Sequence, residues 1–388
     1  MDFTEDDDHR LIREAVRDLC ARFPDEYWSE RDSTHTFPWE FYAAMAEGGW
    51  IGIAMPEEYG GGGRGITEAS IVLEEVAASG ACMNGASAIH MSIFGMHPVV
   101  LHGSDDLRRR VLPDVASGKL HVAFGVTEPD AGLDTTNVTT RAVRDGDAYV
   151  VHGRKVWTSK ALESDKVLLL VRTTPRAEAA KPTQGMTLLV ADLKDPAVAI
   201  SPIDKLGRNA VASCEVVYDG LRVPVENRVG EEGAGFRYLL DGLNAERVLI
   251  AAEALGIGRA ALRRAVAYAG ERVVFDRPIG ANQGIAFPLA DAHARLRAAE
   301  LVIREASWRI DRGLHAGEQA NTAKYLAADA AFQAADAAVQ THGGFGYARE
   351  YHVERYFREA RLQRIAPVPQ EMVLNYLAQH VLGLPRSY

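Results

Sequence analysis

Apolar residues follow a helical period through the first third of the chain. Over residues 8–22 they form one stripe of a helix, at Leu11, Ile12, Ala15, Val16 and Leu19. Thr67 stands where an N-cap is expected before a second apolar run at residues 71–76, and a further helix is expected over residues 86–96. This pattern predicts a helical domain over residues 1–120.

The pattern changes to short β-branched runs in residues 121–233. Runs at 167–171, 186–190 and 215–218 are bounded by turn residues, and no helix-length pattern separates them. Residues 144–147, Arg-Asp-Gly-Asp, read as the turn of a β-hairpin. The region is therefore predicted to be an antiparallel β domain rather than a series of βαβ units.

Helical periodicity returns over residues 234–388. Long segments near 243–270, 282–313 and 318–341 are rich in Ala, Leu, Arg and Glu, which suits an antiparallel four-helix bundle. The order helical, β, helical predicts an α+β fold. No G-x-G-x-x-G follows a predicted strand, so a Rossmann dinucleotide site is not supported.

Composition narrows the choice of partners. The 388-residue chain has 43 Lys and Arg against 53 Asp and Glu, a net charge of −10, which disfavours nucleic acid. Its three cysteines are widely spaced, so neither a disulfide framework nor a metal site is expected. No run is apolar and long enough to span a membrane, and the acidic N-terminal residues match no targeting peptide. We expect a cytoplasmic protein.

The most specific segment is FGVTEPDAGLD at residues 124–134, followed by KVWTS at residues 155–159. In this order the two segments resemble the flavin-binding segments of the acyl-CoA dehydrogenase family. A glycine-containing loop lets backbone N–H groups approach a flavin ring closely. The resemblance implies that FAD contacts residues of both segments, namely Phe124, Val126, Thr127, Gly132, Leu133, Trp157 and Ser159. Leu133 departs from the family, which usually has Ser or Thr there.

Segments of the C-terminal half match the same family. They imply further FAD contacts, at Arg272, Phe275, Gln283, Gln340, Gly343, Gly344, Pro369 and Glu371. In the family the Arg and Phe of the segment ERVVF reach the cofactor across a subunit interface, and an Arg side chain suits a pyrophosphate because it donates two charge-assisted hydrogen bonds. The resemblance implies a homotetramer, built as a dimer of dimers. It covers nearly the whole chain.

The catalytic base is the point at which the chain departs most from the family. Most members carry a glutamate near the C-terminus where this chain has Pro367, which can neither take a proton nor donate an N–H to a thioester. Isovaleryl- and long-chain-type members place the base on the first C-terminal helix, and Glu246 falls on that position. We expect Glu246 to be the base, with Glu371 as the rival.

Two groups of residues are expected around the acyl thioester. Leu243, Asn244 and Arg247 flank Glu246 and, with Leu133, would lie near the substrate. His90 and Phe94 lie on the helix expected over residues 86–96 and could shape the acyl pocket, although a single histidine on an apolar face is more often part of the core.

The function implied is FAD-dependent α,β-dehydrogenation of an acyl-CoA to its trans-2-enoyl-CoA, in fatty acid or amino acid catabolism. An electron-transfer flavoprotein would accept the electrons. Two alternatives stay open on the same fold: a flavin oxidase or monooxygenase, and a dehydrogenase of carrier-protein thioesters. The acidic surface disfavours docking to an acidic carrier protein.

Overall fold

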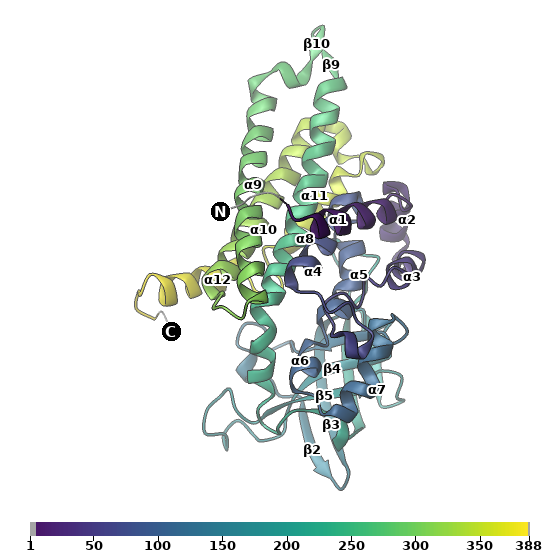
Figure 1. Cartoon of the computed structure of the whole chain (residues 1–388), viewed down its shortest axis with the longest axis vertical. Helices are drawn as coiled ribbons and strands as arrows, with labels where there is room; N and C mark the ends of the chain where they lie inside the picture. Colours follow the sequence, from purple (N-terminus) through teal and green to yellow (C-terminus); the bar gives the residue numbers. More distant parts are fainter. Residues whose placement is uncertain (1–4, 387–388) are drawn as a thin grey trace.

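The structure is a computed structural model that describes residues 5–386. Figure 1 shows helices at both ends of the sequence packed together above a β domain, which lies at the bottom of the view. The N-terminal part is helical, as predicted. Its helices are α1 (Asp7–Cys20), α2 (Asp25–Thr34), α3 (Trp39–Glu47), α4 (Ile66–Val76), α5 (Cys82–Phe94), α6 (His97–His102) and α7 (Asp105–Ala116).

The β domain forms one sheet of eight strands. The strands are β1 (Val122–Gly125), β2 (Arg141–Asp145), β3 (Ala148–Ser159), β4 (Lys166–Arg172), β5 (Met186–Asp192), β6 (Val198–Pro202), β7 (Ser213–Pro224) and β8 (Arg228–Val229). Their order is β6-β7-β3-β2-β4-β5-β8, with β1 beside β4. The predicted hairpin is confirmed as β2 and β3, which are antiparallel. Strand β4 is antiparallel to β5, as expected, but it pairs in parallel with β1 and with one residue of β2, which the expectation did not include.

The C-terminal part is a helical bundle in which α8, α9 and α10 are long and α11 and α12 are short. The helices are α8 (Gly235–Glu271), α9 (Gln283–Asp311), α10 (Gly317–His342), α11 (Val353–Leu362) and α12 (Gln370–Tyr376). A two-stranded hairpin, β9 (Val273–Val274) and β10 (Arg277–Pro278), joins α8 to α9 at the end of the molecule farthest from the sheet (Figure 1). The three long periodic segments predicted from the sequence correspond to α8, α9 and α10.

Helix α8 ties the helical parts into one core. It packs against α4 and α5 from the N-terminal part and against α9, α10 and α11 from the C-terminal part. One continuous cluster of buried apolar residues therefore spans both parts. Small residues allow this close approach: a Cβ on Gly256 would lie 2.4 Å from the carbonyl oxygen of Glu74 in α4. Across the described residues, no helix is long and apolar enough to cross a membrane.

The start of α4 differs from the prediction. Thr67 is not the N-cap, because the helix already begins at Ile66. The cap comes from the far end of α9, where Asp311 accepts hydrogen bonds from the N–H groups of Ile66 at 2.6 Å and Thr67 at 3.0 Å. A carboxylate at a helix N-terminus satisfies free N–H donors and complements the helix dipole. The sequence near Thr67 cannot reveal a cap that lies 244 residues away.

We expect Asp311→Ala to lower the free energy of unfolding by about 1 kcal/mol, because it removes the cap of α4. Urea denaturation of the FAD-saturated protein would measure the change. Thr67→Val is the matched control: it removes one hydroxyl from the same carboxylate and keeps both backbone donors, so its effect should be smaller. Equal stability of Asp311→Ala and the wild type would contradict the assignment of the cap.

Candidate active site

Glu246 lies on the face of α8 that is turned toward α5. One turn earlier on this helix, a Cβ on Gly242 would meet the Phe94 ring at 3.1 Å and the His97 ring at 3.3 Å. Glu246 is half-buried, yet within residues 5–386 its carboxylate accepts no hydrogen bond and forms no ion pair. The neighbouring Arg247 donates instead to Asn244 at 3.0 Å, and Arg263 donates to the carbonyl oxygen of Ala78. Neither of these arginines therefore forms an ion pair with Glu246.

Burial raises the pKa of Glu246 above the ordinary value of a glutamate. The positive charges of His90 and Arg247 oppose this shift, and the negative charge of Glu253 adds to it. A partly desolvated carboxylate with a raised pKa is a stronger proton acceptor, which is the property that a general base needs. The predicted substrate residues Leu243, Asn244 and Arg247 lie half-buried around it.

The predicted flavin segments meet at the edge between β1 and β3. Val156 N–H donates to the carbonyl oxygen of Thr127 at 2.9 Å, which joins the two segments directly. The ladder between β3 and β7 is interrupted between Lys155 and Thr158, and Trp157 at this bulge has φ 61°. The bulge leaves the Trp157 ring 56 % exposed rather than in the core. A flat aromatic face is thus available to a cofactor ring.

The remaining residues of this first group also suit a cofactor. Phe124, Val126, Thr127 and Ser159 are half-buried, and Leu133 is exposed. A Cβ on Gly132 would meet no atom within 4 Å, so open space lies beside this backbone. Ser159 Oγ accepts a hydrogen bond from Arg208 at 3.0 Å. These residues fit the binding of a flavin.

A buried ion pair supports the two flavin segments from below. Lys155 Nζ lies 2.8 Å from Glu128 Oε1 and donates to the carbonyl oxygen of Val126 at 2.9 Å. The other Glu128 oxygen accepts from the N–H and hydroxyl of Thr139. Burial alone would raise the pKa of Glu128, but Lys155 and the neighbouring N–H donors outweigh it and lower that pKa to about 2. The pair therefore stays ionised and fixes the loop that follows β1.

The second group of predicted cofactor residues lies elsewhere. Arg272, Phe275 and Gln283 lie at the hairpin between α8 and α9, at the opposite end of the molecule from the sheet (Figure 1). Phe275 is 92 % exposed. Gln340 lies in the last turn of α10, and Gly343 and Gly344 follow the helix. This end of α10 is near the hairpin, where His342 stacks on Tyr268 with ring centroids 4.2 Å apart. One chain therefore does not bring its two groups to one cofactor.

Pro369 and Glu371 form a third group close to the Glu246 region. Glu371, in the first turn of α12, lies within electrostatic reach of Lys324, which also faces Arg247. Glu371 is exposed and Pro369 half-buried. Pro367 is exposed in the loop between α11 and α12. The structure thus brings the C-terminal loop near the same face of the bundle as Glu246.

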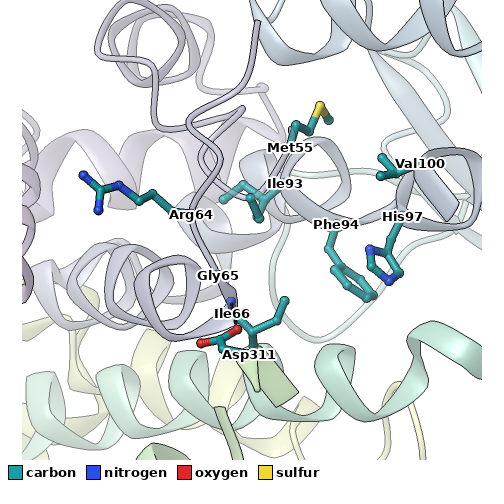
Figure 2. Close-up of a pocket in the computed structure, with 10 residues that line it drawn as sticks. Met55, Arg64, Gly65, Ile66, Ile93, Phe94, His97, Val100 and Asp311 are labelled. Carbon is teal, nitrogen blue, oxygen red and sulfur yellow. Dashed lines mark hydrogen bonds between the residues drawn. The ribbon is translucent and has the colours of Figure 1, made fainter. Parts of the chain in front are cut away.

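Phe94 lines a small apolar cavity of about 160 Å³ beside this face (Figure 2). Its ring stacks on His97 with centroids 4.8 Å apart, and Ile93 and Met55 complete the apolar wall. Figure 2 also shows Asp311 and Arg64 at the margin of the cavity. His90, one turn before Phe94, is buried outside this cavity.

A larger groove of about 730 Å³ opens at the N-terminus of α8. Lys181 and Arg237 lie in it together with Glu178, Glu231 and Glu232. Arg237 stands nine residues before Glu246 on α8, so the groove and the free carboxylate occupy successive parts of one helix. Within the described residues, no cluster of His, Cys, Asp or Glu could hold a metal ion.

Three sequence models of one family match successive parts of the chain: the acyl-CoA dehydrogenase N-terminal domain at residues 6–119, the middle domain at 123–221 and the C-terminal domain at 233–382. The chain belongs to the acyl-CoA dehydrogenase family. It is therefore an oxidoreductase and a flavoprotein whose cofactor is FAD. The resemblance of the sequence motifs to the acyl-CoA dehydrogenase family is therefore confirmed.

Individual relatives agree with this assignment. The acyl-CoA dehydrogenase FadE12 of Mycobacterium tuberculosis is 40 % identical, over 100 % of this chain and 99 % of that protein. A glutaryl-coenzyme A dehydrogenase in complex with glutaryl-CoA superposes with a TM-score of 0.95 at 29 % identity, covering 100 % of this chain and 98 % of that one. A chain in the structure of an electron transferring flavoprotein of Acidaminococcus fermentans superposes with a TM-score of 0.94 at 29 % identity. The match covers 98 % of this chain and 100 % of that one.

Sequence reasoning did not single out three residues at the site. Glu253 is fully buried, and its only sequence signal is a spacing of seven from Glu246, which puts both on one side of α8. Arg208 comes from the loop between β6 and β7. Lys155 stands inside a recognised motif, but nothing in the sequence shows that its amine is buried against Glu128.

We expect Lys155→Met to destabilise the protein by about 3–5 kcal/mol, because it leaves the Glu128 carboxylate buried without its partner. It should also weaken FAD retention, since the same amine holds Val126. Thermal unfolding and the flavin-to-protein absorbance ratio would measure the two effects. The double variant Lys155→Met/Glu128→Gln should lose less stability than Lys155→Met alone; an equal or greater loss would contradict the role of the buried charge.

Proposed function

We propose that this enzyme dehydrogenates an acyl-CoA thioester to its trans-2-enoyl-CoA, with Glu246 as the base that removes the α-proton. The observation that supports this most is the Glu246 carboxylate itself, which is half-buried and free of hydrogen bonds and ion pairs within the described residues. Carboxylates in such surroundings are normally paired, so a free one is suited to accept a proton from a ligand.

The proton step follows from the surroundings of Glu246. The α-proton of a thioester is weakly acidic, so the base gains from a raised pKa and the developing enolate needs stabilising donors. Glu246 must be ionised to act. Because its pKa is raised, the rate should fall as the pH drops through a value above the ordinary pKa of a glutamate. Bound FAD would accept the β-hydride.

The thioester carbonyl needs a different donor from that of most relatives. Pro367 has no N–H, so either a neighbouring backbone N–H of the loop between α11 and α12 donates or the thioester carbonyl is held more weakly. Loss of one such donor typically slows a reaction by about 10²-fold or more.

The nucleotide end of CoA would extend toward the N-terminus of α8, where Lys181 and Arg237 line the larger groove.

The separation of the two cofactor groups supports a shared FAD. The sheet residues around Trp157 and the hairpin residues around Phe275 lie at opposite ends of one chain (Figure 1). The exposed side chains of Phe275 and Val273 at the hairpin suit an interface between chains. We therefore include a homotetramer in this proposal, in which Arg272 and Phe275 of one chain would meet the FAD held by the sheet of another.

The electron acceptor in this proposal is an electron-transfer flavoprotein. A chain of the same fold occurs in a structure of such a flavoprotein, at 29 % identity. A cytoplasmic location and a role in fatty acid or amino acid catabolism rest on the sequence alone.

We expect Glu246→Gln to slow flavin reduction at least about 10²-fold while leaving acyl-CoA binding intact, because the amide keeps the shape and loses the base. Anaerobic titration with acyl-CoAs of increasing chain length, followed by loss of the visible flavin absorbance, would measure both. Glu371→Gln is the matched control, since it removes the rival carboxylate.

The outcomes of this titration separate the alternatives. Bleaching of Glu371→Gln with little bleaching of Glu246→Gln supports the proposal, and the reverse result assigns the base to Glu371. If the wild type is bleached but reoxidises rapidly in air, the oxidase or monooxygenase function is favoured. Bleaching by carrier-protein thioesters but not by CoA thioesters would favour the third candidate.

A further inference from the structure

A buried charged pair joins α5 to α8 next to the proposed base. His90 Nδ1 lies 2.7 Å from Glu253 Oε1, and the two residues are 3 % and 0 % exposed. Burial alone would lower the pKa of His90, but the Glu253 carboxylate outweighs it and raises that pKa. The Glu253 side chain thus favours the protonated form of His90, inside the apolar core that α5 and α8 share.

Each member of the pair keeps one polar atom without a partner. Within the described residues, His90 Nε2 and Glu253 Oε2 are buried and take part in no hydrogen bond. Buried polar atoms of this kind are rare, because each costs the free energy of its lost hydration. These two unpaired atoms do not stabilise the packing of α5 against α8, so a purely structural role does not explain them.

The pair faces Glu246 from two elements. Glu253 follows Glu246 by seven residues, two turns along the same side of α8 and about 10 Å along its axis. His90 faces it from α5. The charges acting on Glu246 are His90, Arg247 and Glu253, and those acting on His90 are Glu253, Glu246 and Arg208.

Arg208 lies beside the cluster formed by Glu246, His90 and Glu253. Its guanidinium is within electrostatic reach of Glu253 and donates to Ser159 Oγ at 3.0 Å and Ser213 Oγ at 2.6 Å. It makes no ion pair within residues 5–386, and its Nε is buried without a partner. The polar cluster thus runs from Glu246 through His90 and Glu253 to the strand that carries Ser159.

We propose that His90 and Glu253 are positioning residues of the reaction, which hold a charge-balanced, hydrogen-bonded pair against Glu246. While the two charges of the pair balance, burial and the charge of Arg247 set the basicity of Glu246. Without the imidazolium, the remaining Glu253 carboxylate would repel the ionised base and raise the pKa of Glu246 further. The inference rests on the proposed role of Glu246 as base.

The test is the pH dependence of anaerobic flavin reduction in single turnover, at saturating acyl-CoA, in four FAD-loaded proteins: wild type, His90→Gln, Glu253→Gln and the double variant. We expect His90→Gln to move the inflection upward by about one pH unit and to slow the acid limb roughly tenfold. The Glu253→Gln inflection should stay in place or move down. The double variant has no charge in the pair, so its inflection should return to that of the wild type.

A purely structural role would not give this pattern, because damage to packing would add up in the double variant instead of cancelling. An unchanged inflection in His90→Gln, or a double variant displaced as far as His90→Gln, would overturn the inference while the proposed function stands. A wild type that no thioester bleaches would overturn the proposed function and this inference with it. A His90→Gln protein that does not fold, beside a folded double variant with the wild-type inflection, would support the inference, since only the unbalanced charge is then harmful.

Discussion

Burial of the Glu246 carboxylate against α5 is the constraint on which the proposed site depends. Helix α8 runs through the core of the molecule and packs against helices from both ends of the chain, so the residues on its α5-facing side are withdrawn from water. An ionisable group there is costly unless it is paired or used. Glu253 on the same side is paired with His90, whereas Glu246 is not. The two glutamates are two turns apart on α8. The paired Glu253 is a supporting residue, and the unpaired Glu246 is the candidate base.

The flavin side of the site depends on a second desolvated charge. The ion pair of Lys155 and Glu128 lies beneath the bulge that turns the Trp157 ring outward, and it also holds the backbone after β1. Both sides of the site therefore rest on buried charges fixed by neighbouring secondary structure. Arg208 connects them, because it donates to Ser159 on β3 and its charge acts on Glu253. Rigid placement of this kind favours a reaction that needs two bonds to the substrate aligned at once.

Local patterns in the sequence are sufficient for the longest helices, the first hairpin and the family. The hairpin of β2 and β3, the three long C-terminal helices and the order of the motifs all follow from residues close together in the chain. Features made by distant residues could not be predicted in this way. Asp311 caps a helix 245 positions earlier, β1 lies parallel to β4, and His90 meets Glu253 across 163 positions. The family resemblance points to Glu246, whereas its unpaired carboxylate is visible only in the structure.

The most direct test of the account is a crystal structure of the FAD-loaded protein with an unreactive acyl-CoA analogue. The account predicts that the Glu246 carboxylate lies about 3–3.5 Å from the substrate α-carbon, on the face opposite the flavin, with Arg272 and Phe275 of a neighbouring chain against the same FAD. An α-carbon closest to Glu371, or a Glu246 carboxylate turned away from the thioester into an ion pair, would contradict it.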